Sequence, residues 1–257
     1  MIKRLRWIYP PSPPSISPAP SSAISTRWNC RKSHRNLFND AAIEPFSNWD
    51  SLSGLEELIL GDNKLTKIQD VGIFKKLLIF DVSFNAITSL QGLSEASSTI
   101  KKLYVSKNEV TKMEEIGHLH ELQILELGSN RLRVMENLQN FTKLQELWPE
   151  RNRIKVINLC GLSCIKKISF QSNRLTSMRG LEECIALEEI YLSHNGLWLN
   201  DNKIESLDGL AEAVSGSREK LTTIYLENNP CAKSPNYNVT LKQIFPNIQQ
   251  IDSEVFA

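Results

Sequence analysis

Apolar residues recur with a period of about 22 residues along most of the chain, in the frame L-x-x-L-x-L-x-x-N with other apolar residues allowed at the leucine positions. One copy departs from the frame, because Pro149 stands at its third apolar position. An incomplete copy, Leu197-Leu199-Asn202, ends only 7 residues after Asn195. Besides this incomplete copy there are eight, the copy with Pro149 included: Leu55-Leu58-Leu60-Asn63, Leu77-Phe80-Val82-Asn85, Ile100-Leu103-Val105-Asn108, Leu122-Leu125-Leu127-Asn130, Leu144-Leu147-Pro149-Asn152, Ile165-Ile168-Phe170-Asn173, Leu187-Ile190-Leu192-Asn195 and Leu221-Ile224-Leu226-Asn229.

This pattern is the signature of leucine-rich repeats, in which each copy forms one short parallel strand followed by a return segment. No copy can bury its apolar face alone, so stacked copies share one continuous core. The asparagine side chain both donates and accepts hydrogen bonds, which suits it to bond the backbone at the turn after each strand. The sequence therefore predicts an α/β leucine-rich-repeat solenoid, with a curved parallel sheet on its concave face and short helical or irregular segments on its convex side.

The residue between the two leucines of each L-x-L points out of the concave sheet, because side chains alternate along a strand. We call this line of residues the concave column. Aromatic residues in register on an exposed face are typical binding anchors, although they could instead pack edge to edge and cover the sheet. After Ile59, the concave column supplies our candidate partner-binding residues, which are Asp81, Tyr104, Glu126, Trp148, Ser169, Tyr191, Trp198 and Tyr225.

The first 35 residues differ from the rest in composition. They hold seven Lys and Arg and no Asp or Glu, and six of the chain's 11 prolines lie in the first twenty residues. We expect residues 1–35 to be disordered, although a basic, serine-rich segment without acids is also typical of an organelle-targeting peptide. The repeat domain is expected over residues 36–257, with a C-terminal cap from about residue 221.

The charge of the repeat domain bears on its partners. Outside residues 1–35 the chain has 30 − 7 = 23 basic and 29 acidic residues, a net charge of −6. An acidic body favours a basic protein surface as partner over nucleic acid, because affinity for phosphates comes from Lys and Arg.

No sequence motif points to catalysis, to a cofactor or to a membrane. The chain has no phosphate-binding loop, no G-x-G-x-x-G, no G-x-S-x-G and no H-E-x-x-H. Cys160 and Cys164 are not followed by a second Cys or His pair at the spacing of a metal site. No apolar run approaches the 18 or so residues of a membrane span. We therefore expect a protein that is not an enzyme, needs no cofactor or metal, and binds no membrane.

Several stretches resemble the family of protein phosphatase 1 regulatory subunit 7. They are residues 121–133 (ELQILELGSNRLR), 191–196 (YLSHNG), 223–230 (TIYLENNP), 244–248 (IFPNI) and 251–252 (ID). The resemblance covers about residues 36–257. It implies a non-catalytic leucine-rich-repeat protein of the nucleus and cytoplasm. It also implies that the concave face binds the catalytic subunit of protein phosphatase 1. We expect the chain to be a monomer apart from this partner.

Carried over position by position, the resemblance gives a partner-binding role to six residues of the concave column: Asp81, Tyr104, Glu126, Trp148, Trp198 and Tyr225. The rival interpretation is a generic leucine-rich-repeat scaffold, for example in an RNP assembly.

The chain departs from the family pattern at three places. Asn36-Leu37 looks like the tail of a first repeat whose strand is absent. Pro149 replaces an apolar strand residue. The family has further repeats at the place between Asn195 and Trp198. Here only seven residues separate Asn195 from Asn202, too few for a crossover between parallel strands, which takes about ten or more. We therefore expect an irregular junction over residues 196–202, at which strand spacing fails and Trp198 leaves the concave column.

Overall fold

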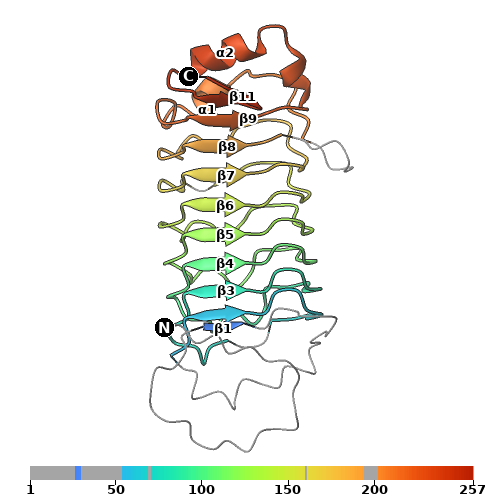
Figure 1. Ribbon diagram of the computed structural model, residues 1–257, viewed down its shortest axis with the longest axis vertical. Helices are drawn as coiled ribbons and strands as arrows, with labels where there is room; N and C mark the ends of the chain where they lie inside the picture. Colours follow the sequence, from blue (N-terminus) through green and yellow to red (C-terminus); the bar gives the residue numbers. More distant parts are fainter. Residues whose placement is uncertain (1–26, 30–53, 69–70, 160, 194–201, 257) are drawn as a thin grey trace, which may run out of the picture.

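The computed structural model describes residues 54–68, 71–159, 161–193 and 202–256, together with the backbone of residues 27–29. The strands of these residues form one 11-stranded sheet in chain order, stacked along the long axis of the molecule (Figure 1). Neighbouring strands are parallel except for the last pair, which is antiparallel. The strands are β1 (Arg27–Asn29), β2 (Glu57–Ile59), β3 (Ile79–Asp81), β4 (Lys102–Tyr104), β5 (Ile124–Glu126), β6 (Glu146–Trp148), β7 (Lys167–Ser169), β8 (Glu189–Tyr191), β9 (Thr223–Tyr225), β10 (Gln250–Ile251) and β11 (Glu254–Val255).

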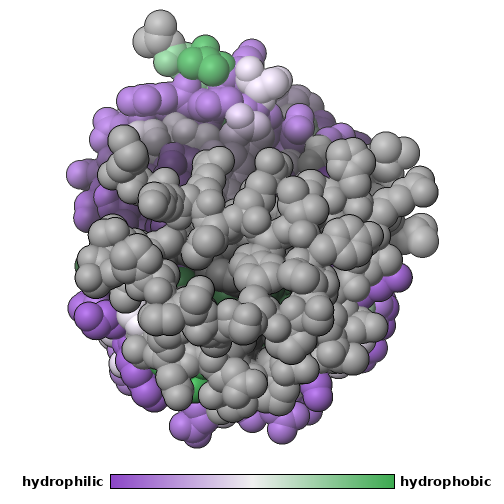
Figure 2. Space-filling view, turned by 60° about the horizontal axis from the view of Figure 1, so that its bottom comes forward, coloured by the Kyte–Doolittle hydropathy of each residue, from purple (hydrophilic) through white to green (hydrophobic). Residues whose placement is uncertain are grey.

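The expected leucine-rich-repeat solenoid is confirmed. The apolar frame residues of every described turn are buried in one continuous core, as in the turn of β5, where Leu122, Leu125 and Leu127 are fully enclosed. Burying such a side chain contributes about 1.5–3 kcal/mol. Around the N-terminal end of the molecule, the described residues visible at the surface are mostly hydrophilic (Figure 2).

Asparagines that are buried, or half-buried in the case of Asn85, join each turn to the one before it. Asn152 is typical: its Nδ2 donates to the carbonyl oxygens of Leu127 (2.9 Å) and Pro149 (3.1 Å), and its Oδ1 accepts the backbone N–H of Leu132 at 2.9 Å. One asparagine per turn therefore satisfies backbone groups of two turns. We call these residues the asparagine ladder, and they are Asn85, Asn108, Asn130, Asn152, Asn173, Asn202 and Asn229.

The short spacing between Asn195 and Asn202 does not interrupt the sheet, so our expectation that strand spacing fails there is wrong. β8 pairs directly with β9, with Tyr191 opposite Tyr225. Asn202 takes the place in the ladder that we expected for Asn195, and its Nδ2 donates to the carbonyl oxygen of Leu192 at 2.9 Å. The incomplete copy therefore supplies the asparagine of the β8 turn and no strand between β8 and β9. Residues 194–201, which include Trp198, lie outside the described residues.

The expectation that the first repeat lacks a strand is also wrong. β1 lies within the segment that we expected to be disordered, and it pairs in parallel with β2, with Arg27 opposite Glu57 and Asn29 opposite Ile59. Strand pairing uses backbone N–H and C=O groups, so it does not require the missing leucines. The division of the chain at residue 35 and the start of the cap near residue 221 stay predictions.

Pro149 shortens the hydrogen-bond ladder between β6 and β7. The equivalent residue of the preceding turn, Leu127, donates its N–H to the carbonyl oxygen of Trp148 at 3.0 Å, but proline has no N–H to donate to Ser169. Pro149 is nevertheless buried in the core. Two register pairs join β6 to β7, compared with three between β5 and β6.

Short helices cover the C-terminal end of the solenoid: α1 (Leu210–Ala213), η3 (Pro230–Lys233) and α2 (Tyr237–Ile244). Asp252 directly follows β10. Its Oδ1 accepts the backbone N–H groups of Leu226 (2.7 Å) and Glu227 (2.8 Å), and its Oδ2 accepts the hydroxyl of Tyr237 at 2.8 Å. The carboxylate therefore ties α2 to the last full turn.

Candidate partner-binding face

The strand register places seven of the eight candidate residues in one line. Asp81, Tyr104, Glu126 and Trp148 are successive partners across β3 to β6. Ser169, Tyr191 and Tyr225 are successive partners across β7 to β9. Trp198 lies outside the described residues. The partner-binding role of these residues stays a prediction.

A second line of side chains lies beside the concave column, and the sequence analysis missed it. It is formed by the first residue of each strand, which faces the same side of the sheet as the third because side chains alternate along a strand. Applying the alternation to the residue before the central leucine would have found this line. We call it the outer column, and its half-buried members are Glu57, Ile79, Lys102, Ile124, Glu146, Lys167, Glu189 and Thr223.

Three aromatic rings of the concave column pack against one another. The ring centroids of Trp148 and Tyr191 are 5.9 Å apart, and those of Tyr191 and Tyr225 are 5.0 Å apart in a stacked arrangement. Ser169 lies between Trp148 and Tyr191 in the line and is only 3% exposed, so its small side chain lets the two larger rings meet above it. We call these three rings the aromatic cluster.

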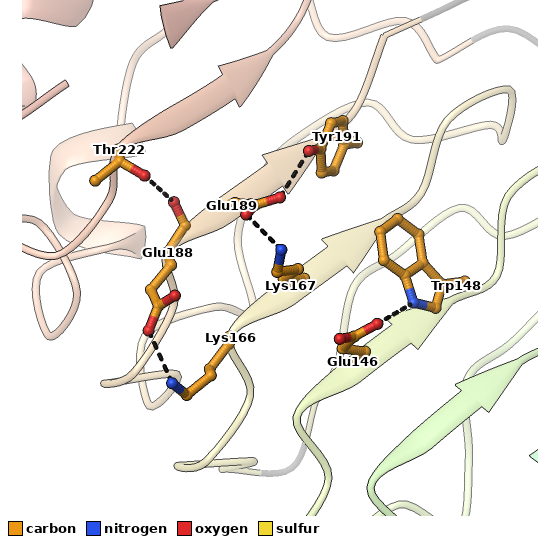
Figure 3. A network of polar contacts seen from close by, with 8 residues as sticks. All are labelled: Glu146, Trp148, Lys166, Lys167, Glu188, Glu189, Tyr191 and Thr222. Carbon is orange, nitrogen blue, oxygen red and sulfur yellow. Dashed lines mark hydrogen bonds and ion pairs between the residues drawn. The ribbon is translucent and has the colours of Figure 1, made fainter. Parts of the chain in front are cut away.

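Glutamates of the outer column hold the polar edges of the aromatic cluster (Figure 3). The Nε1–H of Trp148 donates to Glu146 Oε2 at 3.2 Å, and the hydroxyl of Tyr191 donates to Glu189 Oε2 at 2.7 Å. Lys167 Nζ lies 2.6 Å from the other oxygen of Glu189. Burial and the bond to Glu189 raise the pKa of Tyr191, so its phenol stays a donor at neutral pH. The rings are therefore oriented before any partner arrives.

The other half of the concave column is acidic. It borders a hollow of about 770 Å³ whose described lining includes Asp81, Tyr104 and Glu126. Burial, and then the negative charge of Asp81, raise the pKa of Glu126. Burial and the neighbouring Glu126 likewise raise the pKa of Tyr104. A cation placed here would relieve the repulsion between these carboxylates.

Glu150 is a further acid on this face that the sequence analysis did not single out. Its side chain lies against Gly128 of the preceding turn, where an added Cβ would be 2.3 Å from Glu150 Oε1. Burial raises the pKa of Glu150 to about 7, and Glu126 adds to the shift. Its Oε2 is buried and has no hydrogen-bond partner among the described residues. The ionised carboxylate is therefore poorly accommodated in the free protein.

We expect the Glu150→Gln substitution to stabilise the protein at pH 8 and to have little effect near pH 4.5. Between the ordinary pKa of 4.5 and the folded-state pKa of about 7, the folded state holds a proton that the unfolded state has lost, so the free energy of unfolding falls as the pH rises. A neutral amide removes this loss, a gain of about 2–3 kcal/mol above pH 7.

Urea denaturation of both proteins from pH 4.5 to 8 measures this effect. Parallel pH profiles of the variant and the unsubstituted protein would contradict it. Glu95→Gln, at an exposed position for which no such burial exists, is the matched control.

Two other kinds of site are missing from the described part of the chain. It has no group of three or more His, Cys, Asp and Glu side chains that could hold a metal ion. It also has no helix of the length and apolar character needed to cross a membrane.

The chain has clear relatives among known proteins. It is 63% identical over 260 residues to the protein phosphatase 1 regulatory inhibitor subunit PPP1R7 homolog of Arabidopsis thaliana, and the match covers 87% of this chain and 79% of that protein. A shorter match, 35% identical over 80 residues, links it to the protein phosphatase 1 regulatory subunit pprA of Dictyostelium discoideum, covering 31% of this chain and 21% of that one. No protein-family model matches the chain.

Solved structures support the fold alone. Internalin C2 of Listeria monocytogenes superposes with a TM-score of 0.66 at 20% identity, covering 79% of this chain and 82% of that one. InlJ of the same organism gives a TM-score of 0.64 at 20% identity, covering 88% of this chain and 43% of that one. Both are leucine-rich-repeat proteins of distant sequence.

Proposed function

Because the chain belongs to the family of protein phosphatase 1 regulatory subunit 7, we propose that it binds the catalytic subunit of protein phosphatase 1 through its concave face. It is a regulatory protein and not an enzyme. The proposal rests on one observation in particular: the aromatic cluster and the acidic half of the concave column form one continuous line across seven strands.

The aromatic cluster supports the proposal through its rigidity. Trp148, Tyr191 and Tyr225 stand on β6, β8 and β9, and the Tyr191 ring contacts the other two rings. All three are hydrogen-bonded at their polar edges, to Glu146, Glu189 and Gln250 respectively. Side chains that are already ordered lose little conformational entropy on binding, which leaves more of the gain from desolvation as affinity. Tryptophan and tyrosine are also the residues that most often dominate the binding energy of interfaces.

The acidic half supports a basic partner surface. The raised pKa of Glu126 shows that its charged form is disfavoured in the free protein by burial and by Asp81. A lysine or arginine of the phosphatase beside these carboxylates would lower that pKa and be attracted by both charges. The acidic residues therefore select a partner surface of positive charge, and the aromatic cluster supplies most of the affinity.

Isothermal titration calorimetry of the purified chain with the purified catalytic subunit of protein phosphatase 1 tests the proposal. We expect a one-to-one complex with a Kd of about 1 μM or lower. Internalin C2, which has the same fold at 20% identity, is the control and should give no heat. Absence of a complex at concentrations about tenfold higher would contradict the proposal. Salt-dependent binding of RNA in its place would favour the RNP scaffold.

A further inference from the structure

Basic residues form a row along one flank of the solenoid, away from the concave column. The residue after the ladder asparagine is basic in four consecutive turns: Arg131, Arg153, Arg174 and Lys203. Each donates its backbone N–H to the preceding turn, as Arg153 does to Leu132 and Arg174 to Ile154, both at 2.8 Å. The four residues are thus in register, about 4.8 Å apart along the axis.

More basic residues lie on the same turns. Arg151 precedes Asn152, and Arg133 and Lys155 each lie three residues after their ladder asparagine. The stretches around these asparagines contain no Asp or Glu; they are residues 129–134, 151–156 and 172–177. We call this surface the basic flank, and its members are Arg131, Arg133, Arg151, Arg153, Lys155 and Arg174. Its charge is opposite to that of the acidic half of the concave column and to the net charge of the repeat domain.

An ion pair at the edge of the basic flank is weakly held. Arg131 lies 2.8 Å from Glu109 of the preceding turn, and both side chains are nearly half exposed. An exposed pair of this kind contributes little to stability. Arg131 can therefore exchange Glu109 for an acidic group of a partner at small cost.

Exposed apolar side chains accompany the basic residues. Val134 is 60% exposed and Val156 is 68% exposed, and each lies four residues after its ladder asparagine in neighbouring turns. Valine at two equivalent exposed positions gains by burial against apolar groups. Single-stranded nucleic acid is bound chiefly by aromatic stacking platforms, and the six members of the basic flank and these two valines include no aromatic residue. The pattern therefore fits a protein segment better than RNA.

We propose that the basic flank and its two valines are a second docking surface, which takes an extended acidic segment of another protein in which apolar residues are interspersed. The three turns that carry the basic flank span about 10 Å, which about four extended residues cover. The segment places carboxylates opposite the arginines and an aliphatic side chain over Val134 and Val156. The concave column is left open, so this surface does not depend on phosphatase binding.

Fluorescence anisotropy with a labelled peptide tests this proposal. The probe is Asp-Glu-Leu-Asp-Glu-Val-Asp-Glu, and a peptide with Lys at every acidic position is its control. The Arg133→Glu, Lys155→Glu double variant is expected to weaken binding of the probe at least about tenfold, because charges of like sign across an interface repel. The matched control is the Lys75→Glu, Lys76→Glu variant, which makes the same change of charge at exposed positions outside the flank and should bind as the unsubstituted protein does.

A second variant separates this surface from general charge attraction. The Val134→Ser, Val156→Ser double variant leaves every charge in place. It is expected to weaken binding of the probe about threefold or more. Circular dichroism checks that each variant is folded. Equal weakening by both charge variants, or no loss in the valine variant, would overturn the proposal. Tighter binding of a uridine oligonucleotide than of the peptide, lost in the Arg133→Glu, Lys155→Glu variant, would overturn it in favour of RNA.

Discussion

Replacing Trp148 and Tyr225 together by alanine is expected to weaken binding of the protein phosphatase 1 catalytic subunit by about two to three orders of magnitude. Truncating a central interface aromatic costs about 2 kcal/mol or more, and each 1.4 kcal/mol is about tenfold in Kd. The loss should exceed that of the two contacts alone, because Tyr191 packs between these rings and would be left without both neighbours.

Calorimetric titration of the double variant with the catalytic subunit measures the effect. Val239→Ala is the control, because Val239 is an exposed apolar residue of α2, far along the chain from the aromatic cluster, and its loss should leave the Kd unchanged. Circular dichroism and the melting temperature should stay nearly the same, because all the rings lie on the surface of the sheet. An unchanged Kd in a folded double variant would rule out the concave-face interface.

Asn152→Ala is expected to lower the free energy of unfolding by about 2–4 kcal/mol, without any direct effect on the binding face. The buried side chain donates to Leu127, Pro149 and Glu150 carbonyl oxygens and accepts the N–H of Leu132. Alanine leaves the N–H of Leu132 without a partner, which costs about 1–3 kcal/mol. It also removes one donor from each of the three carbonyl oxygens, which keep bonds from Asn130, Asn173 and the N–H of Ser129. The effect should be large because two turns lose their connection at once.

Urea denaturation measures this loss. Asn140→Ala is the matched control, since the exposed Asn140 makes one bond from its Nδ2 to the carbonyl oxygen of Gly117 at 2.9 Å. We expect the control to lose less than about 1 kcal/mol. If the two variants unfold at the same urea concentration, the asparagine ladder does not stabilise the stack as described.

The period of the sequence was enough to predict the fold, the ladder and the line of side chains, because each follows from a local frame repeated many times. Asn195 and Asn202 show the limit of prediction from a local frame. Both asparagines fit the frame, and which of them closes the β8 turn depends on the pairing of β8 with β9, a contact that local spacing does not contain. β1 was missed because its residues do not match the frame, although its backbone pairs with β2.

Parts of the candidate site depend on neighbours in other turns. In the sequence, Ser169 only interrupts the aromatic residues of the concave column, yet its small side chain is what lets Trp148 contact Tyr191. Glu150 reads as an ordinary surface acid, and its raised pKa comes from burial against Gly128 one turn earlier. Distances across turns decide both properties, so residue types and spacing could not predict them.

Hydroxyl-radical footprinting of the chain, free and bound to the protein phosphatase 1 catalytic subunit, tests the concave-face interface most directly, because the oxidation rate of each aromatic side chain reports its exposure. Trp148, Tyr191 and Tyr225 are partly exposed in the free protein. Binding through the concave face predicts that oxidation of all three falls severalfold in the complex, while oxidation of the exposed Val239 and Val255 in the cap stays the same. Unchanged oxidation of the three rings in a fully formed complex would contradict it.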